Sequence, residues 1–119
     1  MASKPQATVW LPIGTVTLRK EYYVERCKDV FRVRSDTPER AEFGQEVEGS
    51  VMRYVAKALE GQTVTVDEAQ EVLRNSELQL PYQYGHKQRY YAQNVLVALV
   101  ADGKASHTKV GRRFEYHLA

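Results

Sequence analysis

The chain has 119 residues, 43% of them hydrophobic, so it can form one hydrophobic core and is too short for two comfortable domains. Its formal net charge is only +2, so the total charge indicates no particular binding partner. Any electrostatic attraction to a partner must come from where the charges lie along the chain. Cys27 is the single cysteine, which excludes an intramolecular disulfide and a thiolate zinc cluster and predicts a half-buried free thiol.

The first 44 residues are predicted to form an N-terminal extension rich in Val, Tyr, Thr and Phe. Residues 1–6 are expected to be a loose terminus, and the composition predicts a short strand over 7–11 with more extended structure after 15. The polar stretch 35–40 is expected to connect the extension to the rest of the chain. We expect this strand-rich extension to serve dimerisation or packing.

Two patterns compete within the extension. Hydrophobic residues alternate at Val16 and Leu18, and again at Phe31 and Val33, which indicates strands. Apolar residues within 18–31 also recur at helical spacing, so a helix there is an alternative that the sequence leaves open.

The next segment, residues 45–60, predicts an amphipathic helix. Its expected apolar face consists of Val47, Val51, Tyr54, Val55, Ala58 and Leu59, which recur at three- and four-residue steps. Gly61 follows at the position where a helix commonly ends in the left-handed conformation.

A second helix is predicted over 66–74, after a short β-prone stretch at 63–66. Thr65 and Glu68 have the spacing of a capping box, in which each side chain bonds the other residue's backbone N–H. Asn75-Ser76 is expected to end this helix.

The C-terminal third predicts a third helix from about 86 to 101, followed by a β-hairpin. The expected apolar stripe of the helix is Ala92, Val95, Leu96 and Leu99. Asp102-Gly103 ends the helix, and the expected strands are about 104–108 and 113–118, with Gly111 permitting the turn between them.

The charges are unevenly distributed along these segments. Residues 1–44 carry 8 Lys and Arg against 6 Asp and Glu, residues 45–84 carry 3 against 7, and residues 85–119 carry 6 against 2. The cationic excess therefore lies in the third helix and the hairpin.

The order of these elements resembles the winged helix-turn-helix domain of bacterial and phage regulators. The stretch TVTVDEAQEVL, residues 63–73, is similar to the family's first strand and second helix. The stretch NVLVALVADGKASHTKVGRRFEYHL, residues 94–118, is similar to the end of its recognition helix and its wing. The resemblance covers about residues 45–119. It departs from the family in the roughly ten residues that separate the second and third helices, an insertion available for contact with a ligand, a partner or nucleic acid.

The resemblance implies an α+β fold, in which residues 45–119 form a three-helix core with a short strand and a C-terminal β-hairpin wing. Residues 1–44 would then be the β-rich N-terminal extension of that winged helix domain.

The same resemblance implies a sequence-selective double-stranded DNA-binding protein, either a transcriptional regulator or a DNA-binding factor of a mobile element. The third helix would lie in the major groove and the basic wing on the phosphate backbone. The predicted DNA-binding residues are Lys87, Gln88, Arg89, Tyr90, Tyr91, Gln93, Asn94, Lys104, His107, Lys109, Arg112 and Arg113. A homodimer is expected, because a single small reading head commonly binds paired half-sites as a two-fold dimer.

A helical wheel assigns the groove-facing side chains. It turns Lys87, Tyr90, Gln93, Asn94 and Val97 outward, where amide side chains could bond adenine and a lysine could bond guanine. Arg89 lies nearer the buried side of the wheel, which suits a phosphate contact or a structural role.

Two other functions remain open at this stage. A winged helix could bind protein through an aromatic patch of Tyr82, Tyr84 and Tyr91, or bind RNA by stacking those tyrosines on bases. The fold alone does not choose among the three functions.

Other function classes find little support in the sequence. We see neither a phosphate-binding glycine loop nor a nucleophile motif, so we expect no enzyme activity and no cofactor. His86, His107 and His117 lack acidic or cysteine neighbours at ligand spacing, so we expect no metal site.

No apolar run is long enough to span a bilayer and the N-terminus has no signal-peptide hydrophobic region. We therefore expect a cytoplasmic protein, nucleoid-associated if its source is prokaryotic.

Overall fold

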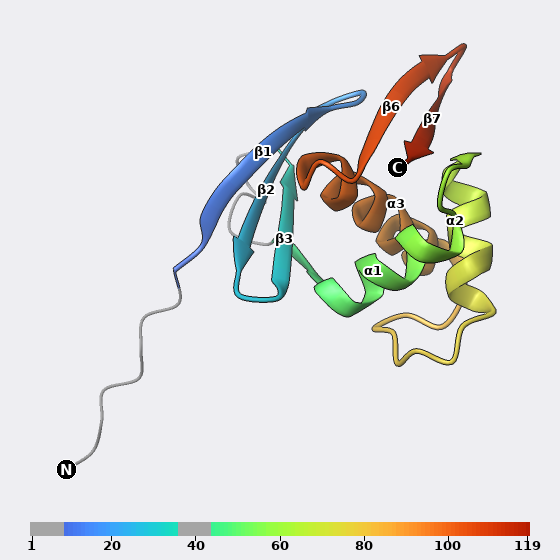
Figure 1. Cartoon of the computed structure of the whole chain (residues 1–119), viewed down its shortest axis with the longest axis horizontal. Helices are drawn as coiled ribbons and strands as arrows, with labels where there is room; N and C mark the ends of the chain where they lie inside the picture. The colour runs from blue at the N-terminus through green and yellow to red at the C-terminus, as the bar shows by residue number, and fades with distance from the viewer. Residues whose placement is uncertain (1–8, 36–43) are drawn as a thin grey trace.

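The computed structural model describes residues 9–35 and 44–119, which form three helices and two antiparallel sheets (Figure 1). The predicted loose terminus, the start of the predicted strand at 7–11 and most of the predicted connection at 35–40 lie outside these described residues.

The N-terminal part of the chain forms a four-stranded sheet in the order β1-β2-β3-β4. The strands are β1 Leu11–Thr17, β2 Glu21–Cys27, β3 Val30–Ser35 and β4 Gln45–Glu48, and each pairs antiparallel with the next. The strand interpretation of the region 18–31 is therefore confirmed, and the helical alternative is wrong.

One face of this sheet is apolar and buried. Its buried side chains are Val16, Tyr22, Val24, Phe31, Val33 and Val47. Because side chains alternate between the two faces of a strand, this set lies on one side of the sheet and requires a covering element.

The predicted helix over 45–60 is shorter in the structure, where α1 spans Gly49–Ala58. Residues 45–48 instead form β4, in which Val47 pairs with Phe31. Val47 fits the helical spacing of the residues that follow it, but its burial comes from the sheet. Gly61 has a φ of 73°, so its predicted left-handed conformation is confirmed.

The second helix matches its prediction, since α2 spans Val66–Arg74 and follows the short strand β5 at Thr63–Val64. The capping box is present. The backbone N–H of Glu68 donates to Thr65 Oγ1 at 3.4 Å, and that of Thr65 donates to Glu68 Oε1 at 3.2 Å.

The C-terminal hairpin also forms as predicted, with strands β6 Ala105–Val110 and β7 Arg113–Leu118. Gly111 in the turn has a φ of 63°, a conformation that glycine adopts without steric cost. β7 lies between β6 and β5, which completes a three-stranded sheet in the order β5-β7-β6.

Helix α3, Gly85–Ala101, lies at the centre of the molecule. It contacts all four strands of the N-terminal sheet on one side, and α1, α2 and β6 elsewhere on its surface. The predicted stripe of Ala92, Val95, Leu96 and Leu99 is buried. The prediction that Asn94 and Val97 face outward is wrong, because they are only 6% and 0% exposed.

The predicted fold, a winged helix with a β-rich N-terminal extension, is wrong. A winged helix would present the outer face of its third helix to a ligand, whereas the four-stranded sheet packs on α3 here. The sheet, the helices and the C-terminal strands contribute to a single hydrophobic cluster, so the molecule is a mixed α+β globule. The physical reason is that the C-terminal half of α3 is apolar on every side and the sheet has an apolar face of its own.

The turn between β2 and β3 holds the start of α1. The backbone N–H of Gly49 donates to the carbonyl oxygen of Asp29 at 2.8 Å. Arg53 donates two hydrogen bonds to the Asp29 carboxylate, at 2.9 and 2.8 Å, and these bonds lower the pKa of that carboxyl. A Cβ atom at Gly49 would overlap the same carboxylate.

We therefore expect Gly49→Ala to destabilise the fold, because the added methyl group displaces the Asp29 carboxylate and disrupts its hydrogen bonds to Arg53. Urea unfolding measures the change. Gly14→Ala is the matched control, because a Cβ there would lie at an ordinary contact distance of 3.5 Å from Ala101. Equal free energies of unfolding for Gly49→Ala and the parent protein would contradict this account.

A second prediction concerns alkaline pH. Burial, with a smaller contribution from Glu48, raises the pKa of Tyr91 from 10.0 to about 12. The folded state therefore retains this proton at pH values where the unfolded chain has lost it. The contribution of Tyr91 to the free energy of unfolding is complete below pH 10 and declines as the pH rises from 10 towards 12. Urea unfolding across this range should show a smaller decline for Tyr91→Phe. If the free energies of unfolding of Tyr91→Phe and the parent protein change with pH in the same way, the prediction is wrong.

Candidate nucleic-acid interface

The structure separates the predicted DNA-binding residues of α3 into two groups. Lys87, Arg89 and Tyr90 are exposed and Gln93 is partly exposed. Gln88, Tyr91 and Asn94 are buried. On the hairpin and before it, Lys104, Lys109, Arg112 and Arg113 are exposed, and His107 is partly exposed.

The three buried side chains have partners inside the protein. Gln88 Oε1 accepts a hydrogen bond from Gln70 Nε2 at 3.2 Å, and Asn94 Nδ2 donates to Gln45 Oε1. The Tyr91 ring packs edge-on against Tyr82, with the ring centroids 6.4 Å apart. Gln88 and Tyr91 therefore have almost no surface left for contact with a base, and Asn94 has only the small part of its side chain that lines a hollow beside α3.

Two turns that are distant in sequence meet above the exposed half of α3. Arg19 Nη2, in the turn between β1 and β2, donates to the carbonyl oxygen of Arg112 at 2.6 Å. The ring Nε2 of His107 lies 3.0 Å from the carbonyl oxygen of Thr17. These contacts bring the basic hairpin to the edge of the N-terminal sheet.

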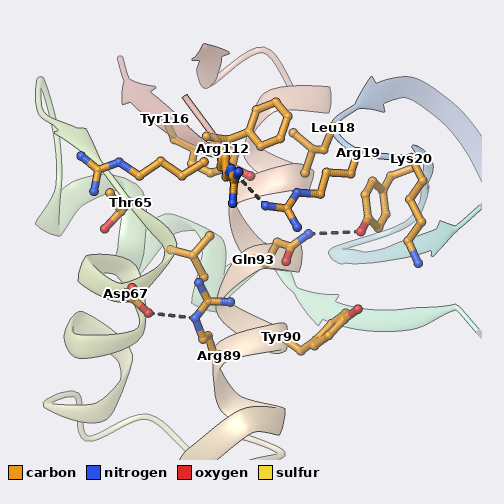
Figure 2. Close-up of a pocket in the computed structure, with 14 residues that line it drawn as sticks. Leu18, Arg19, Lys20, Thr65, Asp67, Arg89, Tyr90, Gln93, Arg112 and Tyr116 are labelled. Atoms are coloured by element: carbon orange, nitrogen blue, oxygen red, sulfur yellow. Dashed lines mark hydrogen bonds and ion pairs between the residues drawn. The ribbon is translucent and has the colours of Figure 1, made fainter. Parts of the chain in front are cut away.

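Below the meeting point lies a hollow of about 500 Å³, which we call the arginine hollow. Its charged lining residues are Arg19, Lys20, Asp67, Arg89, Arg112 and Arg113. Figure 2 shows Arg19 and Lys20 on one side and Asp67 with Arg89 on the other. Tyr90 and Gln93 of α3 lie between them, and Gln93 Nε2 donates to the Tyr22 hydroxyl at 3.2 Å.

The arginine hollow is strongly cationic, with five basic side chains and one carboxylate. Arg89 Nε donates to Asp67 Oδ1 at 2.8 Å across an exposed ion pair, so these two charges offset each other. Among residues 9–35 and 44–119, the Arg112 guanidinium has no hydrogen-bond or ion-pair partner. An unpaired guanidinium in a hollow is suited to a bidentate contact with phosphate.

A second hollow of about 320 Å³ adjoins the first and shares Lys20, Tyr22 and Tyr90 with it. We call it the tyrosine hollow, and its further lining residues include Tyr82, His86, Lys87 and Asn94. None of the described residues that line it is acidic. The two hollows together form what we call the cationic cleft, which runs from the hairpin turn along α3 to its N-terminal end.

A third hollow differs in its charge. It has a volume of about 680 Å³ and lies over α1, where its charged side chains are Arg26, Asp29, Arg53, Lys57, Glu60, Asp102 and Lys104. Acidic and basic residues are mixed there, so a polyanion gains far less from this surface than from the cationic cleft.

The sequence predicted part of the cationic cleft and missed the rest. Lys87, Arg89, Tyr90, Arg112 and Arg113 are predicted residues that the structure brings together there. Arg19 and Lys20 were missed, although two adjacent cations between alternating segments are a usable signal for a basic turn. Lys104 lies in the hollow over α1 instead.

The predicted aromatic patch of Tyr82, Tyr84 and Tyr91 does not form an exposed surface. Tyr91 is 1% exposed and Tyr84 is 80% exposed, so only the latter is freely available to a protein partner.

No protein-family model, curated protein or solved structure matches this chain. In the described part of the chain, none of the helices combines the length and the hydropathy needed to cross a bilayer. Within that same part, no three His, Cys, Asp or Glu side chains lie together as a metal ion requires.

Proposed function

We propose that this protein binds double-stranded DNA through the cationic cleft, and that contacts to phosphates supply most of the affinity. The observation that carries the proposal is the convergence of six basic side chains, with a single carboxylate among the described residues of the cleft. The six are Arg19, Lys20, Lys87, Arg89, Arg112 and Arg113.

The placement of these cations suits an extended anion. They come from three separate segments, namely the β1–β2 turn, the N-terminal half of α3 and the β6–β7 hairpin. A single phosphate would need one compact cluster, whereas a nucleic-acid backbone presents a row of phosphates along its length. The formal net charge of the chain is only +2, so the attraction is local to this cleft.

The side chains that remain available for groove contacts are few. Lys87 is exposed at the N-terminal end of α3 and has donors that match the acceptors on a guanine edge. Gln88 and Asn94 are buried, so fewer side chains are available to read base edges in a groove than the amino-acid sequence predicted. Backbone contacts set affinity and register in this mode of binding.

The test is a titration of a short random-sequence duplex at several salt concentrations. We expect Arg112→Ala to weaken binding at every salt concentration. It should also reduce the slope of log affinity against log salt by about one, because one phosphate contact is lost. Lys57→Ala is the matched control, since it removes one exposed positive charge from the mixed surface over α1.

Two results would overturn the proposal. One is an Arg112→Ala protein whose affinity and salt slope equal those of Lys57→Ala. The other is competition in which an RNA of equal length displaces the DNA duplex at lower concentration, since that result assigns the cleft to RNA.

A further inference from the structure

Tyr90 is the large apolar side chain that the cationic cleft leaves uncovered. It lines both hollows and is 52% exposed, although most other aromatic residues of the cleft are buried or partly buried. Phosphate binding does not require an aromatic ring, so the ring indicates a flat apolar ligand beside the phosphates.

Resting on the DNA-binding function proposed above, we infer that the tyrosine hollow holds one unpaired base of a DNA duplex, stacked on Tyr90. The hollow has a volume of about 320 Å³, which gives room for a base. Aromatic side chains stack on every base because each base has a π-face.

The walls of the tyrosine hollow carry the cations that a nucleotide needs. Lys20 Nζ lies 5.7 Å from the ring centroid of Tyr22, and Lys87 Nζ lies 5.9 Å from that of Tyr82. Each ammonium group therefore lies beside an aromatic wall, where it can pair with the phosphates that flank the inserted base.

A buried polar group in the same hollow is suited to the edge of a base. Asn94 is 6% exposed and lines the hollow. Its Nδ2 donates to Gln45, and its Oδ1 accepts no hydrogen bond from the described residues. Every base has at least one N–H donor on its pairing edge, and that donor becomes free when the base is unpaired.

The arginine hollow favours a ligand that continues as a duplex beside its unpaired base. It adjoins the tyrosine hollow and is lined by four arginines, and apart from the shared Tyr90 the aromatic side chains described in its lining are buried or partly buried, so it is suited to backbone phosphates. Extruding a paired base costs stacking and pairing free energy, and this cost is smallest for a base that is already unpaired.

The experiment compares two duplexes of the same sequence, one fully paired and one with a single extra unpaired base, by competition in fluorescence anisotropy. We expect the parent protein to bind the second duplex roughly tenfold more tightly, which is within the usual effect of stacking one base on an aromatic ring. Tyr90→Phe should keep this ratio and Tyr90→Ala should reduce it to about one.

Two controls separate this inference from the function on which it rests. Arg112→Ala should weaken binding of both duplexes and leave their ratio unchanged. Tyr54→Ala should also preserve the ratio, because Tyr54 is 40% exposed on α1 and outside the cationic cleft.

The outcomes are distinct. Binding of both duplexes with equal affinity, or a ratio that survives Tyr90→Ala, overturns the unpaired-base inference and leaves duplex binding intact. Failure to bind either duplex overturns both proposals. Thermal unfolding of each variant confirms that the exposed substitutions leave the fold intact.

Discussion

Helix α3 is buried from both sides, and its burial determines how the sheets and the other helices pack. The C-terminal half of this helix is apolar around its whole circumference, with Val95, Val97 and Leu99 all at most 2% exposed. A helix of that kind needs cover on every face. The four-stranded sheet covers one side, and the other helices and β6 contact the rest. Because the sheet itself has one apolar face, the two elements bury each other's hydrophobic surface.

The position of the cationic cleft follows from this packing. The two sheets contact the same helix, so a turn from each comes to lie above its N-terminal half, where Lys87, Arg89 and Tyr90 are exposed. The Arg19 bond to the carbonyl oxygen of Arg112 joins those turns across 93 residues of sequence. The polar half of α3 then becomes the floor of a cleft instead of an open helix face. This arrangement concentrates cations from three segments, although the net charge of the whole chain is small.

Local signals in the sequence predicted local structure well. The capping box at Thr65 fixed the start of α2, and strict alternation with Gly111 predicted the C-terminal hairpin.

Long-range packing was not predictable in the same way. Val47 has helical spacing with the residues after it, but it pairs with Phe31 in a sheet. Asn94 is polar and was assigned to the surface, yet strands from the N-terminal part of the chain cover it. The hairpin arginines of the candidate site were predicted, whereas Arg19 and Lys20 join them only through tertiary contacts.

In the proposed function, the sheet and the hairpin together build one cationic surface that binds duplex DNA. Backbone amide NMR of the labelled protein, titrated with a short random-sequence duplex, tests it most directly. Binding in the cationic cleft should shift the amide signals of Arg19, Lys20, Lys87 and Arg112 together and leave those of Asp29 and Lys57 unchanged. Shifts centred on the surface over α1, or on the hairpin without the β1–β2 turn, would contradict it.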